Sequence, residues 1–137
     1  MTQSPTASAA SPIPADTAAD IAKRLQAAVP SVRKVVTISE DNDPNDLIGR
    51  PNGYTDAAVI YDSEVQCAEL GVDCGGTIEI WPSEVDATAR KEYIQTTLKA
   101  NQALGTEYDT VHGSALLRVT SQVKPSRAEA YATAFTS

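Results

Sequence analysis

The spacing of apolar and polar residues along the chain predicts three helices and five strands. Apolar residues recur every three or four positions in residues 17–29, in residues 83–100 and after Pro125. Between these segments lie shorter runs that are rich in β-branched residues or alternate in polarity, which is typical of strands. The predicted strands are residues 33–39, 56–61, 77–81, 106–111 and 114–120.

Residues that commonly begin helices support the three helical predictions. Thr17 and Ser83 each stand three residues before an aspartate, a pattern similar to a capping box. The third helix begins at Pro125 or at Ser126, and the sequence does not choose between them. In the middle helix we expect one side to be buried and the opposite side to face water. The buried side would hold Val85, Ala89, Tyr93, Ile94 and Leu98, and the exposed side Arg90, Lys91, Gln95 and Lys99.

The predicted order of elements is α-β-β-β-α-β-β-α, which belongs to the α+β class. No strand–helix–strand unit repeats, so a five-stranded, mostly antiparallel sheet is favoured over a parallel one. The last two strands meet at His112-Gly113, where we expect a two-residue turn with φ > 0. We expect residues 16–137 to form a single domain with its helices packed on one face of the sheet. The other face would then be open to solvent and would serve as a natural binding surface.

Composition narrows the partners that we expect. The chain of 137 residues is 42% hydrophobic but only 5% aromatic, so its core is built mainly from Ala, Val, Ile and Leu. Its net charge of −7 would repel nucleic acid and anionic membrane surfaces, and we expect neither as a partner. The sequence contains no run of 18 apolar residues, so we expect no segment that crosses a membrane.

Residues 1–15 differ in composition from the rest of the chain. Ser, Thr, Ala and Pro dominate them, which is typical of a flexible tether that buries too little surface to fold. Similar tethers follow the lipidated cysteine of bacterial surface lipoproteins. We therefore expect a disordered tether, and membrane attachment only through an N-terminal lipid anchor that this sequence lacks. The alternative is a ragged N-terminus without a role.

The two cysteines, Cys67 and Cys74, have six residues between them and lie between two predicted strands. This spacing matches no usual zinc site. A local disulfide would stabilise the fold by about 2–2.5 kcal/mol in the chain-entropy model. It would also indicate an oxidising, extracytoplasmic compartment. The alternative is a pair of free, half-buried thiols.

The segment richest in chemically distinctive residues is 41–55, DNDPNDLIGRPNGYT, which joins two predicted strands. Asp41, Asp43 and Asn45 alternate like the first ligands of a calcium loop. The segment lacks the glycine and the glutamate that such a loop requires at its sixth and twelfth positions. These residues are therefore more typical of turn formers, and calcium stays an alternative.

Arg50 is the lone cation of this segment. One interpretation is that its guanidinium binds a carboxylate or phosphate group of a ligand. The other interpretation, which the acidity of the segment favours, is an internal ion pair with Asp43, Asp46 or Asp56.

Tyr54 and Trp81 are candidate anchors at an interface, because each combines an apolar ring with a polar group. Trp81 fits equally well at the rim of the core, since it lies at a strand end beside Pro82. Together with Arg50 and Asn52, these residues make up the predicted contact surface for a ligand or partner.

The sequence contains no pattern that predicts catalysis. His112 is the only histidine, and no Ser, Cys or Asp stands at a recognisable spacing from it. Gly75-Gly76 precedes a predicted strand and not a helix, so it is no phosphate-binding loop. A hydrolase with paired carboxylates stays open, because 18 acidic residues are present and nothing selects a pair. We expect a protein that is not an enzyme and needs no cofactor.

Four segments together resemble a domain of small secreted or lipid-anchored proteins of Gram-positive bacteria, including actinobacteria. These segments are NDPNDLIGRPNGYT, GGTIEIWPSEVDATARKEYI, ALGTEYDTVHGSALLRV and KPSRAEAYATAF. The first contains the motif NDPN-x-L-x-GRP-x-x-YT, and the four span about residues 40–135 in order. His112 departs from the pattern, which has Asn there, and the Cys67–Cys74 insert is typical of a subset only. The family is uncharacterised, so the resemblance implies a compartment and a fold unit but no reaction.

The leading hypothesis is a non-enzymatic extracytoplasmic binding module, the soluble part of a surface lipoprotein. Its partner would be a protein or a component of the cell envelope, and one version of this role is exclusion of, or immunity to, an incoming factor. The alternatives are a calcium-dependent binding module and a hydrolase of wall polymers. A hydrolase would show a deep cleft with two facing carboxylates, whereas a binding module would show a shallow surface.

Overall fold

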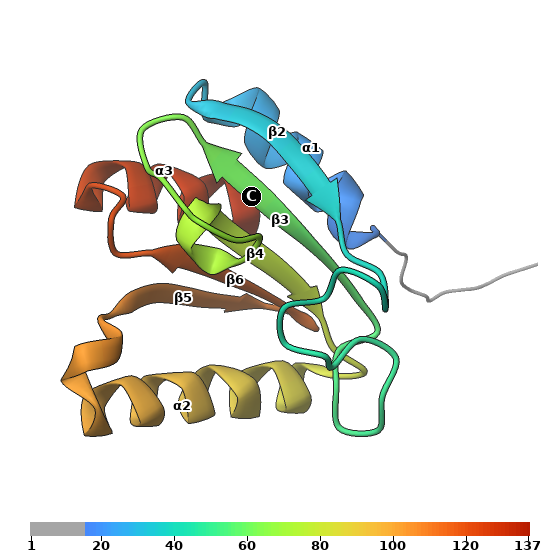
Figure 1. Cartoon of the computed structure of the whole chain (residues 1–137). Coiled ribbons are helices and arrows are strands. Elements are labelled where there is room, and N and C mark those ends of the chain that lie inside the picture. The colour runs from blue at the N-terminus through green and yellow to red at the C-terminus, as the bar shows by residue number, and fades with distance from the viewer. Residues whose placement is uncertain (1–15) are drawn as a thin grey trace, which may run out of the picture.

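The computed structural model describes residues 16–137, and the predicted tether, residues 1–15, lies outside the described residues. Within this range three α-helices and a five-stranded sheet follow one another in the predicted order (Figure 1). The helices are α1 (Ala18–Ala28), α2 (Glu84–Ala100) and α3 (Pro125–Thr136), and two 3₁₀ turns are η1 (Val72–Cys74) and η2 (Gln102–Leu104). The strands are β2 (Val32–Thr37), β3 (Asp56–Asp62), β4 (Gly75–Ile80), β5 (Glu107–His112) and β6 (Ala115–Thr120). Within the described range, no helix has both the length and the apolar character needed to cross a membrane.

The sheet is antiparallel throughout, and its strand order is β2-β3-β4-β6-β5. These observations confirm the α+β class, the order of the elements and the antiparallel sheet. The turn between β5 and β6 lies one residue later than predicted. His112 still pairs with Ala115, and the left-handed residue of the turn is Gly113, with a φ of 59°. A glycine at the first position of a two-residue turn matches the twist of the flanking strands.

The helices begin where the capping residues predict. The Thr17 side chain accepts a hydrogen bond from the Asp20 N–H, and the Asp20 carboxylate accepts one from the Thr17 N–H, which completes a capping box. The Ser83 hydroxyl accepts a hydrogen bond from the N–H of Asp86. Of the two starts considered for the last helix, the structure has Pro125, whose fixed φ suits the first helical position.

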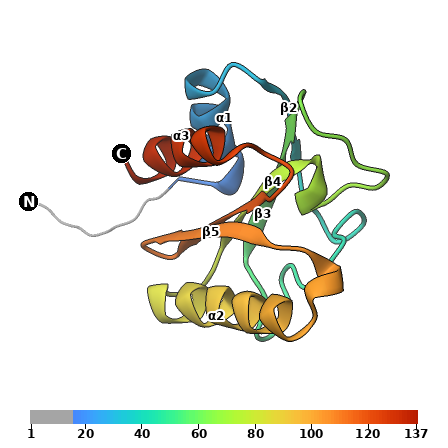
Figure 2. The same ribbon diagram turned by 90° about the vertical axis from the view of Figure 1, so that its left-hand side faces the viewer.

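Helices α1 and α3 pack together on one face of the sheet, as Figure 2 shows. Ile21 and Leu25 of α1 and Tyr131 and Phe135 of α3 are buried in this core. The strands supply the facing apolar residues, which are Val32, Ala58, Ile60, Ile78, Ala115, Leu117 and Val119. This half of the molecule agrees with the predicted packing of helices on a sheet face.

Helix α2 lies on the opposite face, so the prediction that the helices share one face and leave the other open is wrong (Figure 2). Ala87 and Ile94 of α2 belong to a second core with Leu116 of β6. The physical reason lies in the central strands, where adjacent residues such as Leu116 and Leu117 are both fully apolar. Neighbouring strand residues point to opposite faces, so both faces of the sheet need a cover.

Part of that cover comes from the segment between β3 and β4, which contains the predicted disulfide. Cys67 and Cys74 are joined by an S–S bond of 2.02 Å; Cys74 belongs to the second core, and the partly buried Cys67 packs against it. The prediction of a local disulfide is therefore confirmed, and the alternative of two free thiols is wrong. A disulfide is compatible with an extracytoplasmic location.

Helix α2 is rotated relative to the orientation that its apolar spacing predicts. Ile94 is buried in the second core and Leu98 packs against it, as predicted. Three residues of the predicted buried side are exposed, namely Val85, Ala89 and Tyr93. The exposed fractions of Val85 and Tyr93 are 77% and 64%, whereas the side chain of Arg90, predicted to face water, is only 12% exposed. The reason is Glu79, which lies on the face of the sheet that α2 covers. Arg90 turns inward to pair with it.

Candidate functional site

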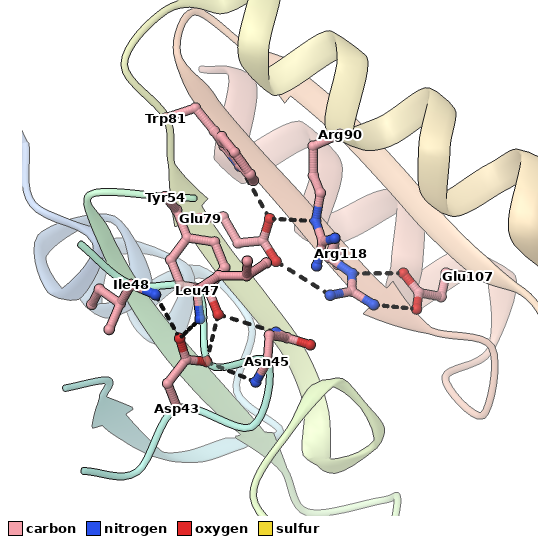
Figure 3. Close-up of polar contacts among 10 residues, drawn as sticks. All are labelled: Asp43, Asn45, Leu47, Ile48, Tyr54, Glu79, Trp81, Arg90, Glu107 and Arg118. Carbon is pink, nitrogen blue, oxygen red and sulfur yellow. Dashed lines mark hydrogen bonds and ion pairs between the residues drawn. The ribbon is translucent and has the colours of Figure 1, made fainter. Parts of the chain in front are cut away.

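The connection between β2 and β3, residues 38–55, folds around the carboxylate of Asp43 (Figure 3). The carboxylate oxygens accept hydrogen bonds from the backbone N–H groups of Asn45, Leu47 and Ile48 and from the hydroxyl of Tyr54. Burial opposes the charge of Asp43, but these hydrogen bonds outweigh it and hold the pKa of the carboxyl below its ordinary value. The segment is therefore a folded unit, which we call the Asp43 loop.

Of the calcium candidates, Asp43 forms the turns of the loop, Asn45 bonds to Tyr54, and Asp41 lies in an exposed turn. Asp43 accepts four hydrogen bonds, about as many as a carboxylate can accept, so a cation would have to displace them. The amide of Asn45 already donates to the hydroxyl of Tyr54. Within residues 16–137, no group of three or more His, Cys, Asp or Glu residues is placed to hold a metal ion.

Tyr54 is a buried support of the loop and offers no surface to a partner. Its exposed fraction is 1%, and its ring packs edge-on against Trp81 with centroids 5.7 Å apart. Its hydroxyl donates to Asp43 and accepts from the Asn45 amide at 3.1 Å. The predicted contact role of Tyr54 is thus replaced by a positioning one, because the side chain holds Asn45 in place.

Arg50 forms the internal ion pair that the acidity of the segment favoured, and its partner is Asp46. Its guanidinium nitrogen lies 2.9 Å from a carboxylate oxygen of Asp46, and both side chains are well exposed. An exposed pair of this kind contributes little to stability, because water and salt screen the two charges. Arg50 therefore stays accessible, but it does not line the cavity described next.

A groove of about 810 Å³ separates the Asp43 loop from the N-terminal half of α2. Its lining comes from three segments: Asn45, Leu47, Asn52 and Gly53 of the loop, Trp81 and Pro82 after β4, and Asp86, Ala89, Arg90 and Tyr93 of α2. Of the four predicted contact residues, Asn52 and Trp81 line this groove. The structure thus brings together two predicted residues that are far apart in the sequence and adds the exposed side of α2.

Glycine is required where the loop turns to form the wall of the groove. A Cβ atom at Gly53 would lie 1.9 Å from the backbone oxygen of Leu47. Gly53 also donates its N–H to the Arg50 carbonyl, at 2.9 Å. Next to it, Asn52 adopts a left-handed φ of 66°, which asparagine tolerates better than most residues. The Asn52-Gly53 pair of the loop therefore has a geometric reason.

Behind the groove lies a buried charged network centred on Glu79 (Figure 3). The Glu79 side chain is 1% exposed and accepts hydrogen bonds from Trp81 Nε1 at 3.1 Å, Arg90 Nε at 3.2 Å and Arg118 at 3.2 Å. Arg118 also makes two hydrogen bonds to Glu107, at 2.9 and 2.7 Å. Arg90 lines the groove as well, so the network fixes one of its walls.

Asp109 adds a titratable group to the edge of this network. Its Oδ2 accepts a hydrogen bond from Gln95 at 2.6 Å, while its buried Oδ1 has no partner within the described residues. Burial and the neighbouring charge of Glu107 raise the pKa of Asp109 to about 7. For Glu107 itself burial has the same tendency, but its hydrogen bonds with Arg118 and the charge of that residue lower its pKa.

This network was not predicted, although the sequence carries a signal for it. Glu79 interrupts the apolar strand GGTIEIW, and Arg118 interrupts the strand ALLRVT. Charged residues are almost never fully buried unless they are paired, so a charge of each sign in two strands with apolar neighbours indicates a buried pair. Arg90 carried no such signal, because a cation on a helix normally faces water.

Comparisons with known proteins add no family assignment. The sequence matches no protein-family model, and neither the curated proteins nor the solved structures contain a match to the chain. The resemblance to the secreted and lipid-anchored proteins of Gram-positive bacteria therefore stays a prediction.

Proposed function

We propose that this protein is a non-enzymatic, extracytoplasmic binding module that holds a protein or an envelope component in the groove. In this proposal the domain is the soluble part of a surface lipoprotein of a Gram-positive bacterium. The observation that carries the proposal is the groove itself, which is lined by two exposed residues, Tyr93 of α2 and Asn52 of the Asp43 loop. A shaped surface that combines aromatic and polar groups is typical of a ligand site.

The disulfide and the N-terminal composition support the extracytoplasmic part of the proposal. The Cys67–Cys74 bond would persist in an oxidising compartment and would be reduced in most cytosols. Residues 1–15 have the composition of the tethers that connect surface lipoproteins to their anchors.

The charges in and behind the groove support binding more than hydrolysis. Within the described part of the chain, the groove lining includes one carboxylate, that of Asp86. Hydrolysis of a glycosidic bond commonly requires two carboxylates that face the same bond. Glu79 is the nearby candidate for a second carboxylate, but it is 1% exposed and is paired with Arg90 and Arg118.

The test is retention of the protein on a cell-envelope fraction of a Gram-positive bacterium, measured by co-sedimentation. We expect Tyr93→Ala and Asn52→Ala each to lower the bound fraction several-fold, because a few central contacts carry most of the binding energy. Tyr108→Ala is the matched control, since Tyr108 is partly exposed but lines a hollow against α3 on another part of the surface. Equal retention of all four proteins would contradict the proposal.

A further inference from the structure

We infer that the ligand of the groove is an uncharged glycan, bound by the faces of its sugar rings and by its hydroxyl groups. This inference rests on the proposed function and names the class of envelope component that the groove would take. It follows from the chemistry of the lining, from the orientation of its amides and from its charge.

The lining combines flat apolar surfaces with planar polar groups. Tyr93 exposes 64% of its surface and Pro82 is exposed beside it, whereas Trp81 is only 7% exposed and adds the small uncovered part of its ring. A sugar ring has an apolar face of C–H groups, which packs on an aromatic ring, and a rim of hydroxyl groups that need hydrogen bonds. A lining that supplies both kinds of contact within one groove fits such a ring better than a purely apolar ligand.

The polar groups of the groove are held in place before a ligand binds. The Asn45 amide nitrogen donates to the hydroxyl of Tyr54, so the amide oxygen is directed away from this contact and can accept from a ligand (Figure 3). Arg90 uses its Nε for Glu79, and its terminal nitrogens stay as potential donors. A sugar hydroxyl both donates and accepts hydrogen bonds, so it can pair with the Asn45 oxygen or with a terminal nitrogen of Arg90. Fixed partners lower the entropic cost of binding.

Charge selects an uncharged ligand over an anionic one. The positive charge of Arg90 is neutralised by Glu79, and the remaining charge of the lining is the carboxylate of Asp86. The chain as a whole carries a net charge of −7. Phosphate-containing wall polymers and acidic polysaccharides would therefore be repelled, whereas a neutral glycan would pay no such cost.

The geometry of the groove favours a glycan over a peptide. A peptide that binds by strand addition needs a free sheet edge, but the groove lies beside β4, which is paired on both sides. A peptide helix needs a groove whose lining is mainly apolar, and this lining contains two asparagines, an aspartate and an arginine. The volume of about 810 Å³ lies within the range of about 300–1,000 Å³ that is usual for small-molecule sites.

Trp81 gives a direct readout of the inference, because it is the only tryptophan of the chain and lines the groove. The probes are the neutral oligosaccharides chitotetraose, cellotetraose and mannotetraose, with polygalacturonate as the anionic probe and a proline-rich peptide as the alternative ligand. We expect at least one neutral oligosaccharide to change the Trp81 fluorescence in a saturable way, and polygalacturonate to have no effect. Tyr93→Ala and Asn52→Ala should weaken the binding about tenfold, as expected for central contact residues, and Tyr108→Ala should leave it unchanged.

The outcomes separate this inference from the proposed function. If no neutral oligosaccharide binds at millimolar concentration, or if binding does not depend on Tyr93 and Asn52, the glycan inference is wrong. Binding of the peptide or of polygalacturonate alone would also overturn it. If the envelope fraction still retains the protein through Tyr93 in these cases, the proposed function survives. If the protein binds neither the neutral oligosaccharides nor the envelope fraction, both the glycan inference and the proposed function are wrong. Circular dichroism of each variant checks that it is folded, so that a loss of binding is not a loss of structure.

Discussion

Glu79 lies at the centre of the packing between helix α2 and the sheet. Its carboxylate is almost completely buried and receives hydrogen bonds from Trp81, Arg90 and Arg118, which come from three separate segments. Removing a charge from water costs several kcal/mol, and this cost is offset only while the partners are in place. Glu79 therefore ties the α2 side of the groove to the centre of the sheet.

Replacing this one charge should have a large effect on stability. We expect Glu79→Gln to lower the free energy of unfolding by about 3–5 kcal/mol, because Arg90 and Arg118 would lose a buried counter-charge. Urea unfolding followed by circular dichroism measures the difference. Asp46→Asn is the matched control, since its pair with Arg50 is exposed and should contribute little to stability. Similar values for the two variants would contradict a structural role for the network.

Asp109 makes the stability of the domain depend on pH near neutrality. Its pKa is raised from 3.8 to about 7 in the folded protein, so its contribution to stability is fully present below pH 3.8. That contribution is lost as the pH rises through about 7, because the folded protein must then bury a second charge beside Glu107. We expect Asp109→Asn to be more stable than the wild type at pH 8, by roughly 1–2 kcal/mol. At pH 4 the two proteins should be nearly equal.

Urea unfolding of both proteins at the two pH values measures this effect. The control is Glu92→Gln, which changes an exposed acid on α2 and should preserve the pH dependence of the wild type. If Asp109→Asn retained the full loss of stability between pH 4 and pH 8, another group would be responsible.

At the scale of elements, α2 shows the limit of prediction from periodicity. The start of the helix followed from Ser83, and its length followed from the run of helix-forming residues up to Ala100. Its orientation did not follow, because Val85, Ala89 and Tyr93 have the spacing of a buried stripe. The helix instead turns Arg90 toward Glu79, and this partner lies on a strand whose position only the folded chain defines. The ion pair between Arg90 and Glu79 thus determines the orientation of α2 more than the apolar stripe does.

Two substitutions in α2 test which side is buried. Ile94→Ala should lower the free energy of unfolding by about 2–5 kcal/mol, because Ile94 belongs to the second core. Tyr93→Ala should change it by less than about 1 kcal/mol, because that ring is largely exposed. Thermal or urea unfolding measures both values. The reverse order would show that Tyr93, and not Ile94, faces the sheet.

At the scale of the whole molecule, the groove exists because segments distant in sequence meet over the face of the sheet that α2 covers. Local patterns in the sequence were sufficient for the strands, the caps, the disulfide and the antiparallel order. The groove was not predictable in this way, since its walls come from residues 45–53 and 81–93 and depend on the orientation of α2. Asn52 and Trp81 were predicted as contact residues from their side-chain chemistry alone. That both line one groove follows from the fold.

The fold also gives the Asp43 loop a different role from the one that its sequence suggests. The sequence offered its polar residues as possible ligands of a cation or as contacts, and the structure uses most of them to build the loop. Asp43 and Tyr54 lie inside, and they position the side chain of Asn45, which reaches the groove. The loop is therefore one preformed wall of a binding surface, and helix α2 is the other.

Amide chemical-shift mapping shows directly whether this groove is the binding surface of the protein. Isotope-labelled protein would be titrated with a soluble digest of Gram-positive envelope, and each backbone amide would be followed by NMR. We predict that the shifted amides cluster in residues 45–53 and 81–93, and that Tyr93→Ala removes the shifts. Shifts that cluster on the exposed edge of β2 or on α3, and that persist in Tyr93→Ala, would contradict the account.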